Sequence, residues 1–169
     1  MRSLALRMVI CSLTVFLSSC GSVIDKDVGE VAIGSRAPGF SLKSLDGATI
    51  TSHSLEGNVV VLNFWATWCG PCAAELPDLK QVAASSGAKV VGIALDEGGM
   101  DTVGPFVKRH GIGEIKNFTV LLGDQDLFQR FNGLGIPYTI LLDRAQRVVK
   151  IYRGPITIDG LEQDLKAIK

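Results

Sequence analysis

Hydrophobic and polar positions follow two different periods along this chain, and together they predict an α/β domain. Residues 59–65 (VVVLNFW) are nearly all apolar and β-branched, which is typical of a central strand that is buried on both faces. Residues 89–96 (KVVGIALD) predict a second strand of this kind. Shorter apolar runs at 118–122, 138–143 and 147–153 predict three further strands, and the tight turn between the last two makes them antiparallel.

Several segments between these strands have the spacing of helices. Residues 102–110, 125–131 and 158–168 each predict a helix. The clearest pattern follows Cys69, where mostly apolar positions recur at intervals of three and four and therefore share one helical face, with Pro77 expected to kink the helix. The positions on this face are Cys72, Glu75, Leu76, Leu79, Val82 and Ala83.

A small hairpin is predicted ahead of the first buried strand. Residues 40–42 and 48–51 flank Asp46-Gly47, a pair that favours the tight turn of a β-hairpin. Strands then alternate with helices, and a second hairpin and a final helix close the chain. This order predicts an α/β fold with a central mixed β-sheet flanked by helices on both faces.

The N-terminus has the pattern of an export signal. Arg2 and Arg7 supply positive charge, and residues 8–17 form an apolar run that is too short to span a bilayer. The run ends in Leu17-Ser18-Ser19-Cys20, which resembles the lipobox of bacterial lipoproteins and implies that Cys20 receives a lipid. An ordinary signal peptide that is cleaved nearby is the alternative.

This pattern divides the chain into three expected parts. Residues 1–19 are the lipoprotein signal peptide, and residues 20–35 are the lipid anchor and a polar tether with little periodicity. Residues 36–169 are long enough for one well-packed domain. The 17 basic and 17 acidic side chains balance, so the charge gives no sign of nucleic-acid binding.

The cysteine count excludes two classes of structural site. Of the four cysteines, Cys11 leaves with the signal peptide and Cys20 carries the lipid, so the domain keeps Cys69 and Cys72. One pair cannot form a disulfide framework. Nor do these cysteines have zinc-ligand spacing to His53 and His110, and we expect neither a metal nor a cofactor.

The remaining pair lies in residues 68–72 (WCGPC), at a predicted strand-to-helix turn. Free backbone N–H groups and the helix dipole favour an anion at a helix start, so the pKa of Cys69 should fall from about 8.5 to about 7. Cys69 is then the attacking thiolate, and Cys72, which is further into the helix, resolves the mixed disulfide. Two inert core cysteines are the alternative.

Two polar residues stand out near this pair. Glu75 lies within the apolar stripe one turn after Cys72, where burial would raise the pKa of its carboxyl. It could therefore take and return the proton of Cys72, although a solvated first-turn glutamate would have the same spacing. Asn63, inside the first buried run, cannot titrate, and it is read as a hydrogen-bonded core amide.

From Pro38 onward the chain resembles the thioredoxin-fold family, and more narrowly the membrane-anchored TlpA/ResA-like thiol–disulfide oxidoreductases. The matching stretches are residues 37–79, 89–97 and 133–154. The resemblance implies a thioredoxin-like fold with an N-terminal β-hairpin at 40–51. It also implies an inserted segment within 97–118, after the strand that follows the active-site helix.

The resemblance also implies roles for individual residues. Cys69 and Cys72 form the redox centre, with Trp68 as a substrate contact beside them. Pro137 matches the family's cis-proline, and the backbone of Ile136 would pair with an extended substrate segment. Glu75 matches the acidic residue that this subgroup carries three positions after the second cysteine, whereas Asn63 replaces the buried aspartate of cytoplasmic thioredoxins.

These implications together predict an exported, lipid-anchored thiol–disulfide oxidoreductase that faces the periplasm or the cell exterior. We expect a monomer that reduces protein disulfides of the envelope, with apocytochrome c thiols as one candidate, and that receives electrons from a membrane thiol donor. The Gly-Pro dipeptide favours the reducing direction, and the oxidising direction stays open. Other readings are a peroxiredoxin-like peroxidase with Thr67 before its cysteine, a copper-delivery protein and a structural lipoprotein.

Overall fold

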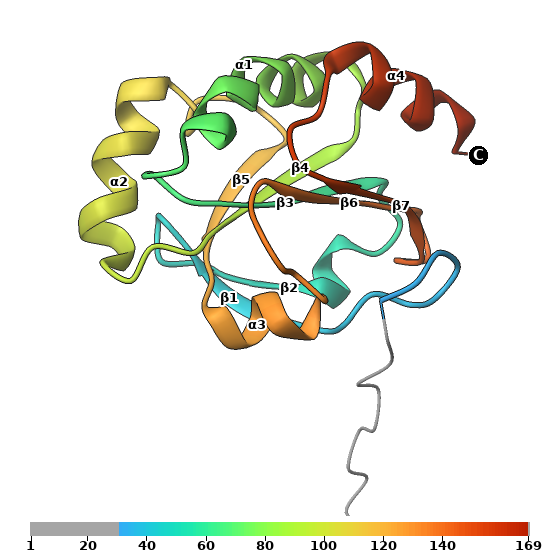
Figure 1. The fold of residues 1–169 in the computed structure, drawn as a ribbon, viewed down its shortest axis with the longest axis horizontal. Coiled ribbons are helices and arrows are strands. Elements are labelled where there is room, and N and C mark those ends of the chain that lie inside the picture. The colour runs from blue at the N-terminus through green and yellow to red at the C-terminus, as the bar shows by residue number, and fades with distance from the viewer. Residues whose placement is uncertain (1–30, 169) are drawn as a thin grey trace, which may run out of the picture.

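A mixed β-sheet of seven strands forms the centre of the structure, a computed structural model that describes residues 31–168 (Figure 1). The strand order is β2-β1-β5-β4-β3-β6-β7, in which β3 pairs in parallel with β4 and antiparallel with β6. The predicted mixed sheet is therefore confirmed. The strands are β1 (Ser41–Ser44), β2 (Thr49–Thr51), β3 (Val60–Trp65), β4 (Lys89–Ala94), β5 (Phe118–Leu122), β6 (Tyr138–Leu142) and β7 (Val148–Arg153).

Helices cover both faces of this sheet, as predicted (Figure 1). The helices α1 (Gly70–Ser85), α2 (Gly99–His110) and α4 (Ile158–Ala167) share one hydrophobic core with β3, β4 and β5. The short α3 (Gln125–Arg130) and the 3-10 helix η1 (Ser52–Leu55) pack into a second core on the other face. None of the helices within residues 31–168 combines the length and the apolar character needed to cross a membrane.

Strand β3 determines which side chains reach the functional region. All its residues are buried, which confirms the central strand that the apolar run predicted. Side chains alternate along a strand, so Val61 and Trp65 join the core beneath α1, and Leu62 and Phe64 join the core on the opposite face. Asn63 lies between Val61 and Trp65 in this alternation, and its side chain therefore faces α1.

Helix α1 buries the predicted face. Its buried residues are those that the spacing placed on one side, from Cys72 to Ala83, and Glu75 is among them. The helix continues through Pro77 to Ser85. The charged side chain within the apolar stripe is thus turned toward the sheet and not toward solvent.

The predicted N-terminal hairpin is present, and a helix occupies the segment expected to hold the insert. Strands β1 and β2 pair antiparallel, and Gly47 occupies the turn with a positive φ of 84°, a conformation that favours glycine. Helix α2 lies in the segment expected to hold the insert, and it begins at Gly99, earlier than predicted. Its start carries no sequence signal because the N-cap residue, Gly98, makes no side-chain cap.

The folded domain begins earlier than the predicted residue 36. Val31 is buried in the core around α3, and Gly34 N–H donates to Val148 O over 2.7 Å. Val148 N–H in turn donates to Ser35 O over 2.9 Å, so this segment extends the edge of the sheet. Residues 31–35, which the sequence assigned to the tether, therefore belong to the domain. The sequence did not indicate this, because backbone pairing with β7 has no hydrophobic signature.

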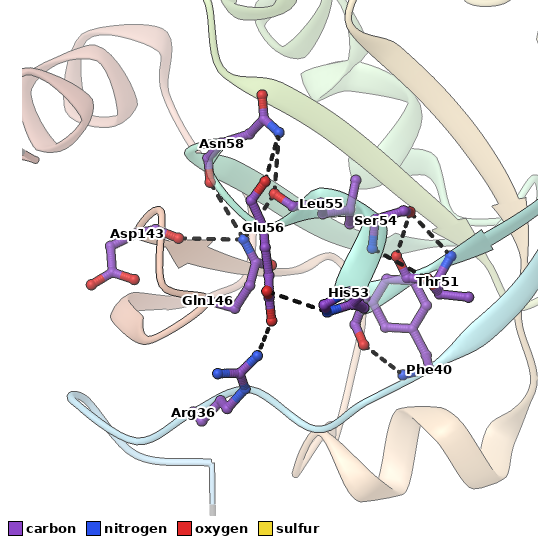
Figure 2. A network of polar contacts seen from close by, with 11 residues as sticks. Arg36, Phe40, Thr51, His53, Ser54, Leu55, Glu56, Asn58, Asp143 and Gln146 are labelled. Atoms are coloured by element: carbon purple, nitrogen blue, oxygen red, sulfur yellow. Dashed lines mark hydrogen bonds and ion pairs between the residues drawn. The ribbon is translucent and has the colours of Figure 1, made fainter.

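Polar contacts fasten this N-terminal segment to the base of the domain (Figure 2). Arg36 forms an ion pair with Glu56, whose other carboxylate oxygen lies 3.2 Å from His53 Nδ1. The buried Gln146 amide donates to Leu55 O over 3.1 Å and ties the β6–β7 turn to η1. Because Val60 pairs with Leu142 at this end of the sheet, the segment lies at the opposite end of β3 from the cysteine motif.

Candidate active site

Cys69 and Cys72 form a disulfide at the point where β3 gives way to α1. Their Cα atoms are 5.3 Å apart. Cys69 is 6% exposed and Cys72 is 1% exposed, so Cys69 is the more accessible residue of the pair, as predicted. Both values are low, because both cysteines belong to the hydrophobic core that α1 shares with the sheet.

The start of α1 is built to stabilise negative charge on Cys69. Cys69 is the N-cap residue, and Cys72 N–H donates to its Sγ over 3.2 Å. In the reduced protein this N–H and the helix dipole favour the thiolate over the thiol. Pro71 occupies the first turn of the helix, where its missing N–H removes no helical hydrogen bond.

Glu75 lies beneath this turn as a buried carboxylate. It is 3% exposed and belongs to α1, one turn beyond Cys72. Its Oε1 accepts a hydrogen bond from Asn63 Nδ2 over 2.8 Å, and its Oε2 accepts one from Ile156 N–H over 3.1 Å. The two polar residues that the sequence singled out separately are therefore direct partners.

Burial raises the pKa of Glu75 above its ordinary value, because the charged carboxylate loses its hydration. The hydrogen bonds from Ile156 N–H and Asn63 oppose this effect by favouring the ionised form, and the negative charge of Asp78 adds to it. Burial is the largest of these influences on the pKa. Glu75 is thus a carboxyl that holds its proton to higher pH than an exposed glutamate.

Thr139 completes this polar group, and sequence reasoning did not identify it. Thr139 pairs with Asn63 across β3 and β6, and its Oγ1 accepts a second hydrogen bond from Asn63 Nδ2 over 2.9 Å. Both protons of the Asn63 amide are therefore engaged, one by Glu75 and one by Thr139. A polar residue two positions after Pro137 in an otherwise apolar strand was the available signal.

The second predicted motif lies at the same end of the sheet as the disulfide. Tyr138 pairs with Phe64, so Pro137 lies beside the last residue of β3, next to the cysteine turn. The Ile136–Pro137 peptide bond is cis, in agreement with the resemblance. Ile136 is half-buried against the core that contains both cysteines, whereas Trp68 is 73% exposed.

Thr67 and Asp96 form a contact on the other side of the turn that sequence reasoning also missed. Asp96 follows β4, and its carboxylate accepts hydrogen bonds from Thr67 N–H and from Thr67 Oγ1, the latter over 2.5 Å. The carboxyl ends of adjacent parallel strands meet at one edge of a sheet, so the order of the strands was the available signal. The Thr67 hydroxyl donates its hydrogen bond to Asp96, so it cannot also donate to Cys69 as the peroxidase interpretation requires.

The two histidines lie apart from the cysteine turn. His53 belongs to η1 and contacts Glu56, whereas His110 ends α2 and stacks on Phe106 with ring centroids 4.2 Å apart. Within the described part of the chain, no group of three or more His, Cys, Asp or Glu side chains is arranged to hold a metal ion. The predicted lipidation site, Cys20, lies outside the described residues.

Comparisons with known proteins agree with this geometry. The Redoxin family model matches residues 32–167. The thiol-disulfide oxidoreductase ResA of Geobacillus thermodenitrificans is 34% identical over 82% of this chain and 79% of its own length. A thiol:disulfide interchange protein of Chlorobium tepidum has a similar structure, with a TM-score of 0.68 and 33% identity over 80% of this chain and 97% of its own.

A lipoprotein is also among the similar structures. The exposed lipoprotein thioredoxin of Streptococcus pneumoniae has a TM-score of 0.63 and 28% identity, over 78% of this chain and all of its own length. The match of one family model to nearly the whole described domain, and the identity to a ResA protein, show where the chain belongs. It is a member of the Redoxin family and a thiol–disulfide oxidoreductase similar to ResA.

Proposed function

We propose that this thiol–disulfide oxidoreductase works as a reductant of protein disulfides in the cell envelope, anchored by a lipid on Cys20. The observation that carries the proposal is the Cys69–Cys72 pair at a helix start with the buried Glu75 one turn beyond. The helix start favours the Cys69 thiolate, and the Glu75 carboxylate is the proton acceptor that we assign to the second thiol. Together these features suit two successive exchange steps.

In the first step the Cys69 thiolate attacks one sulfur of a substrate disulfide. The substrate S–S bond breaks, a mixed disulfide with Cys69 forms, and the other substrate sulfur leaves as a thiolate that takes up a proton. The Cys72 N–H that reaches Cys69 Sγ over 3.2 Å supports this role, because it stabilises the anion before attack.

In the second step Cys72 attacks Cys69 Sγ and releases the substrate. Cys72 loses its proton to Glu75, the mixed disulfide breaks, and the substrate leaves with both of its cysteines reduced. The protein is left with the Cys69–Cys72 disulfide. A dithiol donor of the membrane then returns two electrons by the same exchange chemistry and becomes a disulfide itself, and its two protons replace those that the two substrate sulfurs took up. Glu75 gives its proton back to Cys72, and Cys69 is again the thiolate.

The exposed surface beside the disulfide suits an extended polypeptide substrate. Trp68, which directly precedes Cys69 in the chain, is largely exposed. The N–H and C=O of Ile136 have no hydrogen-bond partner within residues 31–168, so they are free to pair with a substrate segment in the manner of an added strand. Pro137 holds Ile136 at this edge. Apocytochrome c, with its haem-site thiols, is one candidate suggested by the resemblance.

Trapping the mixed disulfide tests this function directly. In a Cys72→Ser variant the second step cannot occur, so substrates should remain attached to Cys69 and be released by dithiothreitol. The matched control is Cys69→Ser, which keeps Cys72 and should trap nothing. Mixed disulfides on Cys72 in that control, or none in the first variant, would contradict the assigned order of attack.

The reduction potential tests the direction. The Gly-Pro turn predicts a value near the reducing end of the range that runs from about −270 mV for thioredoxin to about −120 mV for a strong oxidant. Equilibration with glutathione or dithiothreitol buffers measures it. A value near the oxidising end would assign the protein to disulfide formation instead.

Cell fractionation tests the anchor. The intact protein should enter the membrane fraction, and Cys20→Ala should release it while leaving exchange by Cys69 unchanged. The N-terminal segment supports this arrangement, because it leaves the domain at the end of β3 opposite the cysteine turn. Retention of Cys20→Ala in the membrane fraction would count against the lipid anchor without affecting the chemistry.

A further inference from the structure

Asp96 is a buried carboxylate that the exchange steps described above do not use. It is 7% exposed and takes part in none of the ion pairs found within residues 31–168. A buried carboxylate loses its hydration, and without a cation nearby this loss must be offset by hydrogen bonds. The residue that donates hydrogen bonds to Asp96 therefore indicates the role of this carboxylate.

That partner is Thr67, two residues before Cys69. Within the described residues, the side-chain hydrogen bonds of Asp96 all come from Thr67: the backbone N–H lies 3.1 Å from Oδ2 and 3.2 Å from Oδ1, and Thr67 Oγ1 lies 2.5 Å from Oδ1. Both donors of Thr67 are thus satisfied by one carboxylate. The contact fixes the end of β3 to the end of β4, beside the redox motif.

Thr67 is part of the tight turn that presents Trp68. Cys69 N–H donates to Ala66 O over 3.1 Å and closes this turn. Trp68 follows Thr67 within it, is 73% exposed and lies outside both hydrophobic cores of the described domain. Packing in the core therefore does not hold the indole, and its direction depends on the backbone of the turn.

Cys69 has support that Trp68 lacks. As the N-cap of α1 it accepts a hydrogen bond from Cys72 N–H at its sulfur and one from Ala73 N–H at its carbonyl, over 3.2 and 3.1 Å. The helix thus holds Cys69 from one side, and Asp96 holds Thr67 from the other. Loss of the Asp96 contact would free the Trp68 side of the turn and leave the thiol in place.

We propose that Asp96 is a positioning residue for exchange with protein substrates: it fixes Thr67 and so directs the Trp68 indole toward the polypeptide that carries the substrate cysteines. This inference rests on the substrate contact proposed for Trp68. A small disulfide reaches Cys69 without that contact, whereas a polypeptide uses it. Asp96 therefore acts on the selection of protein substrates and not on the reactivity of the thiol.

The test compares two oxidants of the reduced protein, insulin as a protein disulfide and 5,5′-dithiobis(2-nitrobenzoate) as a small one. Asp96→Ala should lower the second-order rate constant with insulin about fivefold and change that with the small disulfide by less than about twofold. Trp68→Ala should lower the insulin rate about tenfold. Asp96→Asn keeps an oxygen that accepts from Thr67, so it should retain the insulin rate within about twofold.

Fluorescence anisotropy of Trp68, with Trp65→Phe as the background, provides a second readout, and it should fall in Asp96→Ala but not in Asp96→Asn. Equal losses with both oxidants, or full insulin activity in Asp96→Ala, would overturn the proposal. If the loss of insulin activity in Asp96→Ala equalled the fraction of unfolded protein measured by circular dichroism, the proposal would also be overturned. Unchanged insulin activity in Trp68→Ala would contradict both the proposed Trp68 contact and the role of Asp96 that depends on it. The reaction with the small disulfide would still report exchange by Cys69.

Discussion

The Asn63 amide donates a hydrogen bond to the Glu75 carboxylate over 2.8 Å and so connects the middle of β3 to α1, one turn beyond Cys72. An amide at this place can support the charge of a carboxylate but cannot itself carry a proton away. Within the group of Glu75, Asn63 and Thr139, the proton transfer that we propose near the cysteines therefore falls to Glu75. The consequences can be measured in the pH dependence of exchange and of stability.

Glu75→Gln should slow the second exchange step by about a hundredfold, because Cys72 loses its proton acceptor. In the wild-type protein this step requires ionised Glu75, so its rate should rise with pH through the raised pKa of Glu75. The variant should lack that rise. Single-turnover release of substrate from the Cys69 mixed disulfide, followed across pH, measures both effects.

Asp78→Asn is the matched control on the same helix. The negative charge of Asp78 raises the pKa of Glu75. Removing this charge should therefore move the rise in the rate of the second exchange step to lower pH without abolishing the rise. A pH profile of Glu75→Gln identical to that of the wild type would show that Cys72 gives its proton to another acceptor.

Stability should also depend on the ionisation of Glu75. Its pKa is raised in the folded protein, so between the unfolded and the folded pKa the folded state holds more protons than the unfolded chain. The contribution of Glu75 to the free energy of unfolding is therefore greatest below its pKa in the unfolded chain, about 4.3. It is lost as the pH rises toward the pKa of Glu75 in the folded protein. Urea denaturation of the oxidised protein across pH measures this loss.

The free energy of unfolding of Glu75→Gln across pH provides the comparison, but this variant also loses a hydrogen-bond acceptor. Both carboxylate oxygens accept hydrogen bonds, from Asn63 and from Ile156, and glutamine offers only one acceptor. The resulting cost does not depend on pH, so the change with pH in the difference between the two proteins isolates the ionisation. A difference that stays constant from pH 4 to pH 8 would contradict the raised pKa.

How far the sequence anticipated this site depends on the range of each signal. Periodicity placed Glu75 on the buried face of α1, and the single amide in an apolar strand marked Asn63, because both patterns are local. Their contact was not predictable, since it requires the packing of α1 on β3. Thr139 and Asp96 were missed for the same reason: β6, which contains Thr139, and β4, which Asp96 follows, pair with β3 although they are distant from it in sequence. Residues 31–35 were missed because only Val31 among them is buried, and one buried side chain beside backbone pairing leaves no periodic pattern.

Thr139→Val should destabilise the oxidised protein by about 1–3 kcal/mol, because one proton of the buried Asn63 amide loses its acceptor. The loss should also let the amide turn away from Glu75 and shift the rise in rate to higher pH. Urea denaturation and the pH profile of substrate release measure the two effects.

Thr139→Ser is the control for this prediction. It keeps the hydroxyl oxygen and loses a buried methyl group, so it should cost about 1 kcal/mol and leave the pH profile unchanged. If valine and serine at this position gave the same stability and the same profile, Thr139 would fill space without orienting Asn63.

Gly92→Ala should destabilise the domain by about 1–3 kcal/mol through overpacking beside the active site. Gly92 pairs with Asn63 across β4 and β3, and a Cβ there would lie 2.9 Å from Trp65 Nε1 and 3.3 Å from Phe118 Cε2. Trp65 and Phe118 are both buried, and Trp65 also packs on Phe106, so neither aromatic ring can move freely. Trp65 is the last residue of β3, so the strain should also reach the cysteine turn and lower the rate of exchange.

Gly104→Ala is the matched control, because its Cβ would meet only Met100 Sδ, at 3.3 Å, the flexible end of a side chain on the same helix. Alanine is favoured over glycine in a helix by about 1 kcal/mol, so this variant should be as stable as the wild type or more so. Urea denaturation of both variants makes the comparison. If Gly92→Ala were as stable as Gly104→Ala, the sheet beneath the cysteine turn would accommodate an added methyl group. That result would contradict the close packing around Trp65 on which this prediction rests.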